Sequence, residues 1–375
     1  MKFFSGKIVG TTAAAMAIAV MAGCSQQARK AKYEAKGDKY FDAGQYAEAE
    51  VEYLNAAKLD PDDAHALTRL GTIYLEDGKY MHAFPVLSRA KNLNTNDLNV
   101  RFQNGFLQWR SGFRKEARLE ALAILDKDPK YSEAAFLLAE AIEGKDIEDA
   151  QKRIEHVVQQ TGITAESEIA LGTLEFKTGN LDGAQKRFIH AQSLDAKRAD
   201  AFYGLGMVYW RKNDLTNADH FLKQGADLSP MRSIQRLGYA DFKTRTGRVE
   251  EGKQMFTEMT HAIPDCLLPW LALAEIAIVQ RNLGECQKMI GQVMARDPDN
   301  FQAQLVGARI KLLGGHADDA IADYERLAAR FKTSSQVFFQ MGLACVQKGD
   351  STRGHVAGGR EKNRVGVEAN RRDNS

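Results

Sequence analysis

Residues 169–210 read IALGTLEFKTGNLDGAQKRFIHAQSLDAKRADAFYGLGMVYW. Apolar residues in this stretch recur three and four positions apart, a spacing that places them on one face of a helix. Gly179 interrupts the pattern at a point where the end of a helix favours a positive φ angle. Gly172 recurs 34 residues later as Gly206. The stretch therefore predicts a helix, a turn and a second helix, followed by the start of the next such unit.

The same spacing extends through most of the chain. A small residue recurs every 34 residues, with one interval of 33, at Gly37, Gly71, Gly105, Ala139, Gly172, Gly206, Ala240, Ala274, Ala308 and Gly342. A second small residue follows each of the first nine by 12 positions, or by 11 in the fourth unit, at Ala49, Ala83, Ala117, Ala150, Ala184, Ala218, Gly252, Cys286 and Ala320. Pairing Gly71 with Ala83 would let the two helices of a unit approach closely. We therefore predict an all-α chain of stacked helix pairs.

These positions resemble the tetratricopeptide repeat (TPR), whose pattern is W-x₂-L-G-x₂-Y…A-x₃-F…P. The best matches are Tyr33, Gly37, Tyr40, Ala49, Tyr53, Ala56 and Pro61, and then Gly172, Gly179, Ala184, Phe188 and Ala191. The resemblance implies an α-solenoid over residues 30–350, with nine full repeats and the first helix of a tenth. It also implies a right-handed superhelix in which each helix pair covers the apolar face of its neighbour.

The N-terminus has the features of an export signal. Lys2 and Lys7 precede an uncharged run over residues 8–23, which is too short to cross a bilayer as a helix. The run ends Met21-Ala22-Gly23-Cys24, which resembles the bacterial lipobox. We expect residues 1–23 to be a signal peptide and residues 24–29 to be a lipidated N-terminus and short linker. The resemblance places the protein on the outer membrane, facing the periplasm; the alternative is an ordinary signal peptide followed by an incidental Cys24.

Composition excludes several classes of protein. Apolar residues make up 44% of the 375, enough for a large core, and four cysteines are too few for a disulfide scaffold. Without Lys2 and Lys7, the 51 basic residues become 49, which equals the number of acidic residues. Because the mature chain then has no net charge, nothing favours nucleic acid as a partner.

The polar residues indicate no catalytic or metal site. The eight histidines are dispersed, and the sequence contains neither HExxH nor CxxC. No nucleophile motif or glycine-rich nucleotide loop is evident. We therefore expect no metal, no cofactor and no enzymatic activity.

The TPR resemblance also predicts a binding groove. In TPR proteins, positions two, five, nine, twelve and thirteen of each first helix line the concave face. In repeats three to six, the predicted groove residues are Phe102, Phe106, Trp109, Arg110, Phe136, Phe176, Tyr203, Met207, Trp210 and Arg211, with Glu140, Ile169 and Lys177 at further positions of the same set. In repeats eight to ten the corresponding lining is aliphatic, with Leu268, Leu271, Ile278, Leu305, Leu312 and Leu343. Burial in a packed core would explain some of the aromatic residues instead.

The C-terminal segment departs from the repeat. Residues 351–375 contain no Leu, Ile, Met, Phe, Tyr or Trp, so they cannot form the second helix of a tenth unit. They are either a basic arm or the product of a truncated or frame-shifted gene. The second alternative leaves the apolar residues around Phe339 and Leu343 uncapped, and that surface could support homo-oligomerisation.

Together these features predict a lipid-anchored, non-enzymatic scaffold that binds an envelope protein or peptide. The chain resembles the TPR lipoproteins that accompany exosortase (PEP-CTERM) and exopolysaccharide systems, and more distantly those of pilus and outer-membrane assembly. Two alternatives stay open. The chain could be the N-terminal TPR part of a truncated enzyme such as a transferase, or a carbohydrate-binding protein in which Trp109 and Trp210 stack on sugar rings.

Overall fold

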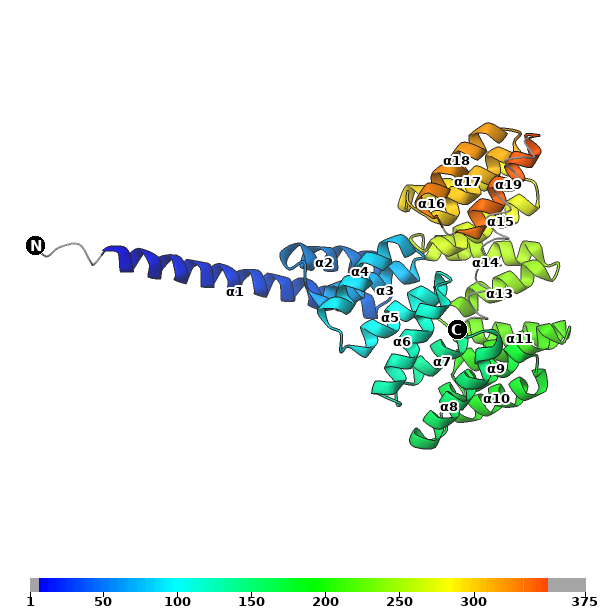
Figure 1. The fold of residues 1–375 in the computed structure, drawn as a ribbon, viewed down its shortest axis with the longest axis horizontal. Helices are drawn as coiled ribbons and strands as arrows, with labels where there is room; N and C mark the ends of the chain where they lie inside the picture. The colour runs from blue at the N-terminus through cyan, green and yellow to red at the C-terminus, as the bar shows by residue number, and fades with distance from the viewer. Residues whose placement is uncertain (1–6, 333, 350–375) are drawn as a thin grey trace, which may run out of the picture. The chain divides into compact units, whose positions relative to one another are not determined.

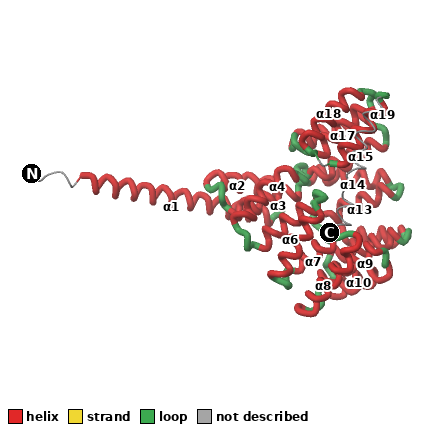
Figure 2. The backbone as a smooth tube through the Cα atoms, in the orientation of Figure 1, coloured by secondary structure: helices red, strands yellow, loops and turns green. Residues whose placement is uncertain are grey.

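The computed structural model describes the backbone of residues 7–332 and 334–349, and within these ranges the side chains from residue 25 onward except residue 145. Helices joined by short loops account for this part of the chain, and it contains no strand (Figure 2). The prediction of an all-α fold is confirmed. The helices are α1 (Lys7–Asp42), α2 (Tyr46–Leu59), α3 (Ala64–Glu76), α4 (Tyr80–Leu93), α5 (Leu98–Arg110), α6 (Arg114–Lys127), α7 (Ser132–Ala141), a short 3₁₀ helix (Gly144–Asp146), α8 (Ile147–Thr161), α9 (Ala165–Thr178), α10 (Leu181–Leu194), α11 (Ala199–Arg211), α12 (Leu215–Asp227), α13 (Ile234–Arg245), α14 (Val249–Ala262), α15 (Leu267–Val279), α16 (Leu283–Arg296), α17 (Phe301–Leu313), α18 (Ala317–Arg330) and α19 (Ser335–Gln347).

The chain divides into two compact units, of which the first ends at Leu228 and the second begins at Ser229. We call them the N-terminal unit and the C-terminal unit. Within each unit, an odd-numbered helix packs against the even-numbered helix that follows it (Figure 1). Successive odd-numbered helices also contact one another, from α3 to α11 in the N-terminal unit and from α13 to α19 in the C-terminal unit. We call this arrangement the odd-helix row.

Glycines allow the two helices of a pair to approach closely. A Cβ atom on Gly71 would lie 2.4 Å from the side chain of Leu87, one helical turn beyond Ala83. The glycine thus accommodates a large side chain sixteen residues later, a contact that the sequence analysis did not predict. The same relation recurs between Gly37 and Tyr53, Gly172 and Phe188, and Gly206 and Leu222. The predicted approach of the two small residues of a unit is seen in the seventh pair, where a Cβ on Gly252 would lie 2.6 Å from the Ala240 carbonyl oxygen.

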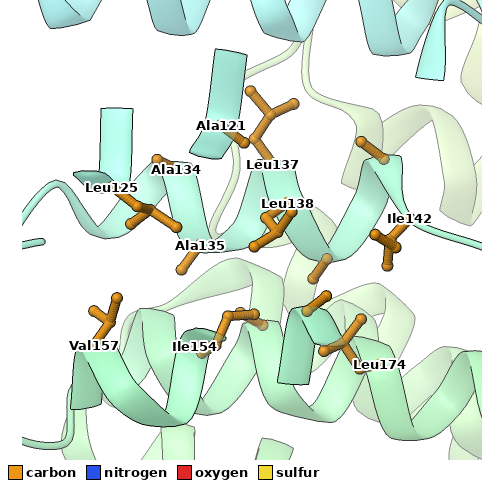
Figure 3. Close-up of a cluster of buried hydrophobic side chains, with 14 of the residues drawn as sticks. Ala121, Leu125, Ala134, Ala135, Leu137, Leu138, Ile142, Ile154, Val157 and Leu174 are labelled. Carbon is orange, nitrogen blue, oxygen red and sulfur yellow. The ribbon is translucent and has the colours of Figure 1, made fainter. Parts of the chain in front are cut away.

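The fourth helix pair is irregular, as the shortened spacing in the sequence indicates. Helix α7 has ten residues and ends at Ala141, and the 3₁₀ helix follows before α8 begins. Gly144 at the start of that short helix has a φ of 66°. Figure 3 shows Leu138 of α7 directed toward Ile154 of α8, within a buried cluster that also includes residues of α6 and α9. The fourth unit is one residue shorter than the others between its two small residues. Because α7 ends early, the unit accommodates this difference and its core stays packed.

Helix α1 is continuous from Lys7 to Asp42. The predicted signal peptide and lipidated Cys24 fall where side chains are not described, and residues 351–375 lie outside the described residues altogether. In the part of the chain that the structure covers, none of the helices combines the length and apolar character needed to cross a membrane.

A cluster of charged groups joins α1 to the start of α3. The Lys30 ammonium lies 3.1 Å from Asp60 and 3.7 Å from Glu34, and it also contacts Asp63. Asp63 caps α3 by accepting a hydrogen bond from the backbone N–H of Ala66 at 2.8 Å. Burial and a hydrogen bond to Asp63 raise the pKa of Glu34 to about 7. Near pH 6, Glu34 is therefore protonated and shares its proton with the Asp63 carboxylate.

We expect Glu34 to make the chain less stable as the pH rises from 5 to 8. Its pKa is higher in the folded than in the unfolded chain, so the stabilisation is full below about pH 4.5 and is lost as the pH passes about 7. Because the group is partly exposed, the contribution is about 1 kcal/mol after solvent screening. Burial acts to raise the pKa of Asp63, but hydrogen bonds from Glu34 and Lys30 lower it to about 2. Asp63 therefore stays ionised throughout this range.

The measurement is urea denaturation of the full chain at pH 5 and pH 8, with Glu34→Gln as the control. Glutamine keeps a hydrogen-bond donor toward Asp63 but cannot ionise. The variant should therefore lose less stability than the wild type between the two pH values. Equal losses in both proteins would contradict a protonated Glu34.

Candidate partner-binding surface

Five aromatic side chains from α5 and the start of α7 form one connected cluster, which we call the aromatic surface. Its residues are Phe102, Phe106, Trp109, Tyr131 and Phe136. Ring centres are 5.9 Å apart for Phe102 and Phe106, 5.1 Å for Phe106 and Trp109, 5.9 Å for Phe102 and Tyr131, and 6.5 Å for Trp109 and Phe136. All five side chains are partly exposed. Because each ring contacts at least one other, the exposed faces are held in place.

Helical periodicity explains why three of these rings share one face. Phe102, Phe106 and Trp109 are spaced by four and three residues, so they project from the same side of α5. The opposite side of the helix carries the buried Val100 and Leu107. All three rings pack against the buried cluster formed by α6, α7, α8 and α9. Figure 3 shows side chains of this cluster. The aromatic surface is therefore the exposed margin of a well-packed core.

A second group of predicted groove residues lies on α9 and α11, farther along the odd-helix row. Its members are Phe176, Tyr203, Met207, Trp210 and Arg211, none of which is fully buried. The guanidinium of Arg211 lies 5.0 Å from the ring centre of Phe176 and donates a hydrogen bond to the Phe176 carbonyl at 2.8 Å. Phe136 and Phe176 both pack against one buried cluster that includes Ile169 and Leu205. Phe136 thus links the aromatic surface to the second group.

Lys177 stabilises the surface rather than lining it. Its ammonium donates to the carbonyls of Ala139, Glu140 and Ile142 at 2.7, 2.7 and 3.2 Å, and its Nζ lies 3.7 Å from a carboxylate oxygen of Glu140. These carbonyls belong to the C-terminal end of α7, which has no helical residues beyond Ala141 to satisfy them. Burial lowers the pKa of Lys177 and raises the pKa of Glu140. The pair is therefore a partly desolvated cap for the shortened helix.

Several residues predicted to line the groove are instead in the core. Ile169, Ile278, Leu305 and Leu312 are buried, so their assignment to an exposed lining is wrong. These four face neighbouring helices because adjacent pairs approach closely enough to cover part of each first helix. In the C-terminal unit, the exposed apolar side chains of the odd-helix row are Val279, Leu313, Phe339, Leu343 and Val346, of which the sequence analysis assigned only Leu343 to the groove.

Tyr131 is the one member of the aromatic surface that the sequence analysis missed. It precedes α7 as its N-cap residue, outside the helical positions that the repeat pattern assigns to the groove. The sequence offered one indication of its role: Tyr131 lies directly before the helix that carries the predicted groove residue Phe136. The repeat pattern assigns groove residues only within helices, so it does not include Tyr131.

The described residues contain no group of three or more His, Cys, Asp or Glu side chains arranged to hold a metal ion. Cys266, Cys286 and Cys345 are buried. Burial raises the pKa of Cys286 to about 11, so it is a thiol at neutral pH and a poor nucleophile.

Comparisons with known proteins agree with this geometry. A family model described as "TPR repeat" matches residues 37–78, and one described as "Tetratricopeptide repeat" matches residues 169–227. The chain contains tetratricopeptide repeats. The first matched segment covers the end of α1, then α2 and α3, and the second covers most of α9 and all of α10, α11 and α12. Proteins built from TPRs generally bind other proteins.

More distant similarities extend over longer parts of the chain. DnaJ homolog subfamily C member 3 of Rattus norvegicus is 24% identical over 366 residues, which cover 87% of this chain and 71% of that protein. Cellulose synthase 1 operon protein C of Komagataeibacter xylinus is 23% identical over 196 residues, covering 48% of this chain and 15% of that protein. The crystal structure of yeast Tom70 matches 88% of this chain and 84% of its own, with a TM-score of 0.51 and 14% identity. The similarity to Tom70 supports the TPR fold alone.

Proposed function

We propose that this protein is a non-enzymatic scaffold that binds a segment of a partner protein on the aromatic surface of the N-terminal unit. The observation that carries the proposal is the contact network of Phe102, Phe106, Trp109 and Phe136, whose rings pack on one another and still remain partly exposed. Contiguous exposed apolar side chains on a folded protein indicate an interaction site.

The physical properties of the surface suit protein recognition. Tryptophan, tyrosine and arginine contribute most of the energy in many protein interfaces, because large side chains there bury much area. Rings already fixed by neighbours lose little conformational entropy when a partner binds. Trp109 contacts two other rings of the surface and lies beside Arg110 at the end of α5. It is therefore the residue expected to contribute most to binding.

We also propose an anchor and a location for the scaffold. Lipid attached to Cys24 would hold the protein on the outer membrane, facing the periplasm, where the partner is an envelope protein or peptide. Helix α1 supports the arrangement because it continues without a break from Cys24 into the first helix pair. The partial similarity to a protein named for a cellulose synthase operon supports a role in an exopolysaccharide or secretion system, with envelope assembly as the alternative.

The test of the binding proposal is the variant Trp109→Ala in the full chain. We expect it to recover at least tenfold less partner from envelope extracts than the wild type, a loss of about 1.4 kcal/mol. The partner proteins would be measured by quantitative mass spectrometry of the bound fraction. Circular dichroism would confirm that the variant keeps its helical content.

The matched control is Trp270→Ala in the C-terminal unit. Trp270 is also partly exposed, and it donates a hydrogen bond to the Pro264 carbonyl and contacts Arg296. Because it lies outside the aromatic surface, its removal should leave recovery unchanged. Equal recovery by the wild type and Trp109→Ala would remove the basis of the proposal.

A further inference from the structure

Two arginines, one beside the aromatic surface and one within the second group, are held by neutral groups. Arg110, the last residue of α5, donates from Nε and Nη2 to the Tyr80 hydroxyl at 3.1 and 3.0 Å. Arg211, the last residue of α11, is held by the carbonyl and ring of Phe176. Among the residues that the structure describes, neither guanidinium has a carboxylate within ion-pair distance. Their positive charges are therefore not neutralised by the protein.

Arginines in comparable places show that this is not general. Arg245 is also the last residue of its odd-numbered helix, α13, and it pairs with Asp241 at 2.8 Å. Arg69 on α3 lies 3.4 Å from Asp38, and Arg309 on α17 lies 3.5 Å from Glu275. A cation near the C-terminal end of a helix is favourable in itself. That effect applies equally to Arg245, so it does not explain why Arg110 and Arg211 lack a carboxylate.

Both guanidiniums keep hydrogen-bond donors available for a ligand. A guanidinium carries five N–H donors in a planar fork that matches the two oxygens of a carboxylate. The contact of Arg110 with Tyr80 occupies Nε and Nη2 and leaves Nη1, whereas Arg211 uses only Nη1. Because Tyr80 and Phe176 already fix the side chains, binding a carboxylate costs little additional entropy.

The odd-helix row sets the separation of the two charges. Arg110 and Arg211 lie on α5 and α11, which are three helices apart in a row whose neighbours are in contact. Packed helices lie 8–10 Å apart, so the separation is roughly 25–30 Å. An extended chain rises about 3.3 Å per residue and covers this distance in about eight or nine residues. The same distance would need about eighteen residues of helix.

We propose that the surface binds an extended acidic–apolar peptide segment: two acidic residues flank an apolar stretch of about eight residues, and Arg110 and Arg211 bind the two carboxylates. This inference rests on the proposed function, since it names the chemistry of the segment that the aromatic surface binds. The apolar stretch would lie on Trp109, Phe136 and Phe176. The guanidiniums then fix its register and exclude segments with basic ends.

The test uses a random library of 16-residue peptides displayed on phage and selected on the immobilised full chain. Parallel selections use Arg110→Gln/Arg211→Gln, Trp109→Ala, and Arg245→Gln as the matched control. We expect the wild type and Arg245→Gln to enrich Asp and Glu at least fivefold on both sides of an apolar stretch. The double arginine variant should lose that enrichment and keep the apolar stretch.

Two further variants keep the test informative if Arg110→Gln/Arg211→Gln is unstable. Tyr80→Phe removes the hydroxyl that holds Arg110 but keeps both charges, and it should weaken the acidic preference on one side only. Arg110→Glu/Arg211→Glu should select Lys and Arg at both sides. Retention of the acidic enrichment by the charge-reversed protein would overturn the inference.

The outcomes separate the inference from the function on which it rests. The inference alone would be overturned if the wild type selects peptides with neutral or basic flanks and Trp109→Ala does not enrich those peptides. If the wild type enriches no more peptides than Trp109→Ala, the proposed function fails together with the inference.

Discussion

Replacing Phe188 by alanine should lower the free energy of unfolding of the N-terminal unit by about 4 kcal/mol. Phe188 lies on α10 with 3% of its surface exposed. Its ring occupies the space left by two glycines, because a Cβ on Gly172 of α9 or on Gly204 of α11 would come within 3.0 or 2.6 Å of it. One side chain therefore fills the gap between two members of the odd-helix row. Urea denaturation followed by circular dichroism measures the loss.

The control for Phe188→Ala is the same substitution at an exposed phenylalanine. Phe113 is 49% exposed and makes one edge-to-face contact, with Phe84. Its replacement by alanine removes less buried area and should cost less than about 1 kcal/mol. Similar losses for both variants would mean that the structure around Phe188 collapses onto the cavity. The packing of the helices at Gly172 and Gly204 would then not depend on the Phe188 ring.

The architecture was predictable because it depends on periodicity alone. A period of 34 residues with small residues in two fixed phases indicates repeated helix pairs, and a turn glycine marks the end of most first helices; Asn213 and Arg281 hold that positive-φ position after α11 and α15. Gly179 has a positive φ angle, as the sequence analysis predicts, and so do the glycines at the corresponding positions of other units, Gly44, Gly78, Gly112, Gly247, Gly315 and Gly349. The spacing within α5 likewise placed Phe102, Phe106 and Trp109 on a common face. Such relations lie within one helix and need no knowledge of its neighbours.

Contacts between helices were harder to predict, because sequence spacing gives the direction of a side chain around its own helix but not the tilt of the next helix. The contact of Gly71 with Leu87 was therefore not predicted, and Ile169 lies in the core. The division of the repeats after Leu228 has no signal in the 34-residue register. Lys177 was assigned to the groove because it occupies a groove position of the repeat pattern. Because α7 ends early, its ammonium instead donates hydrogen bonds to the carbonyls at the end of that helix.

We expect Lys177→Met to destabilise the N-terminal unit by about 3 kcal/mol at pH 8. The substitution keeps much of the side-chain volume but removes three hydrogen bonds to the carbonyls at the end of α7 and the cation beside Glu140. A partly buried carboxylate without its cation is costly, so Glu140 accounts for much of the loss. Urea denaturation at pH 5 and pH 8 measures the effect.

The pH dependence and a second substitution separate the two contributions. Burial raises the pKa of Glu140, so its protonated form is favoured in the folded chain, and that stabilisation is lost as the pH rises. Lys177→Met should therefore be less destabilised at pH 5, and adding Glu140→Gln should recover part of the loss at pH 8. Lys152→Met is the control, because Lys152 makes an exposed pair with Glu148, and its denaturation midpoint should not change. If Lys177→Met matches the wild type at pH 8, water satisfies the carbonyls of α7, and the shortened helix that carries Phe136 needs no side-chain cap.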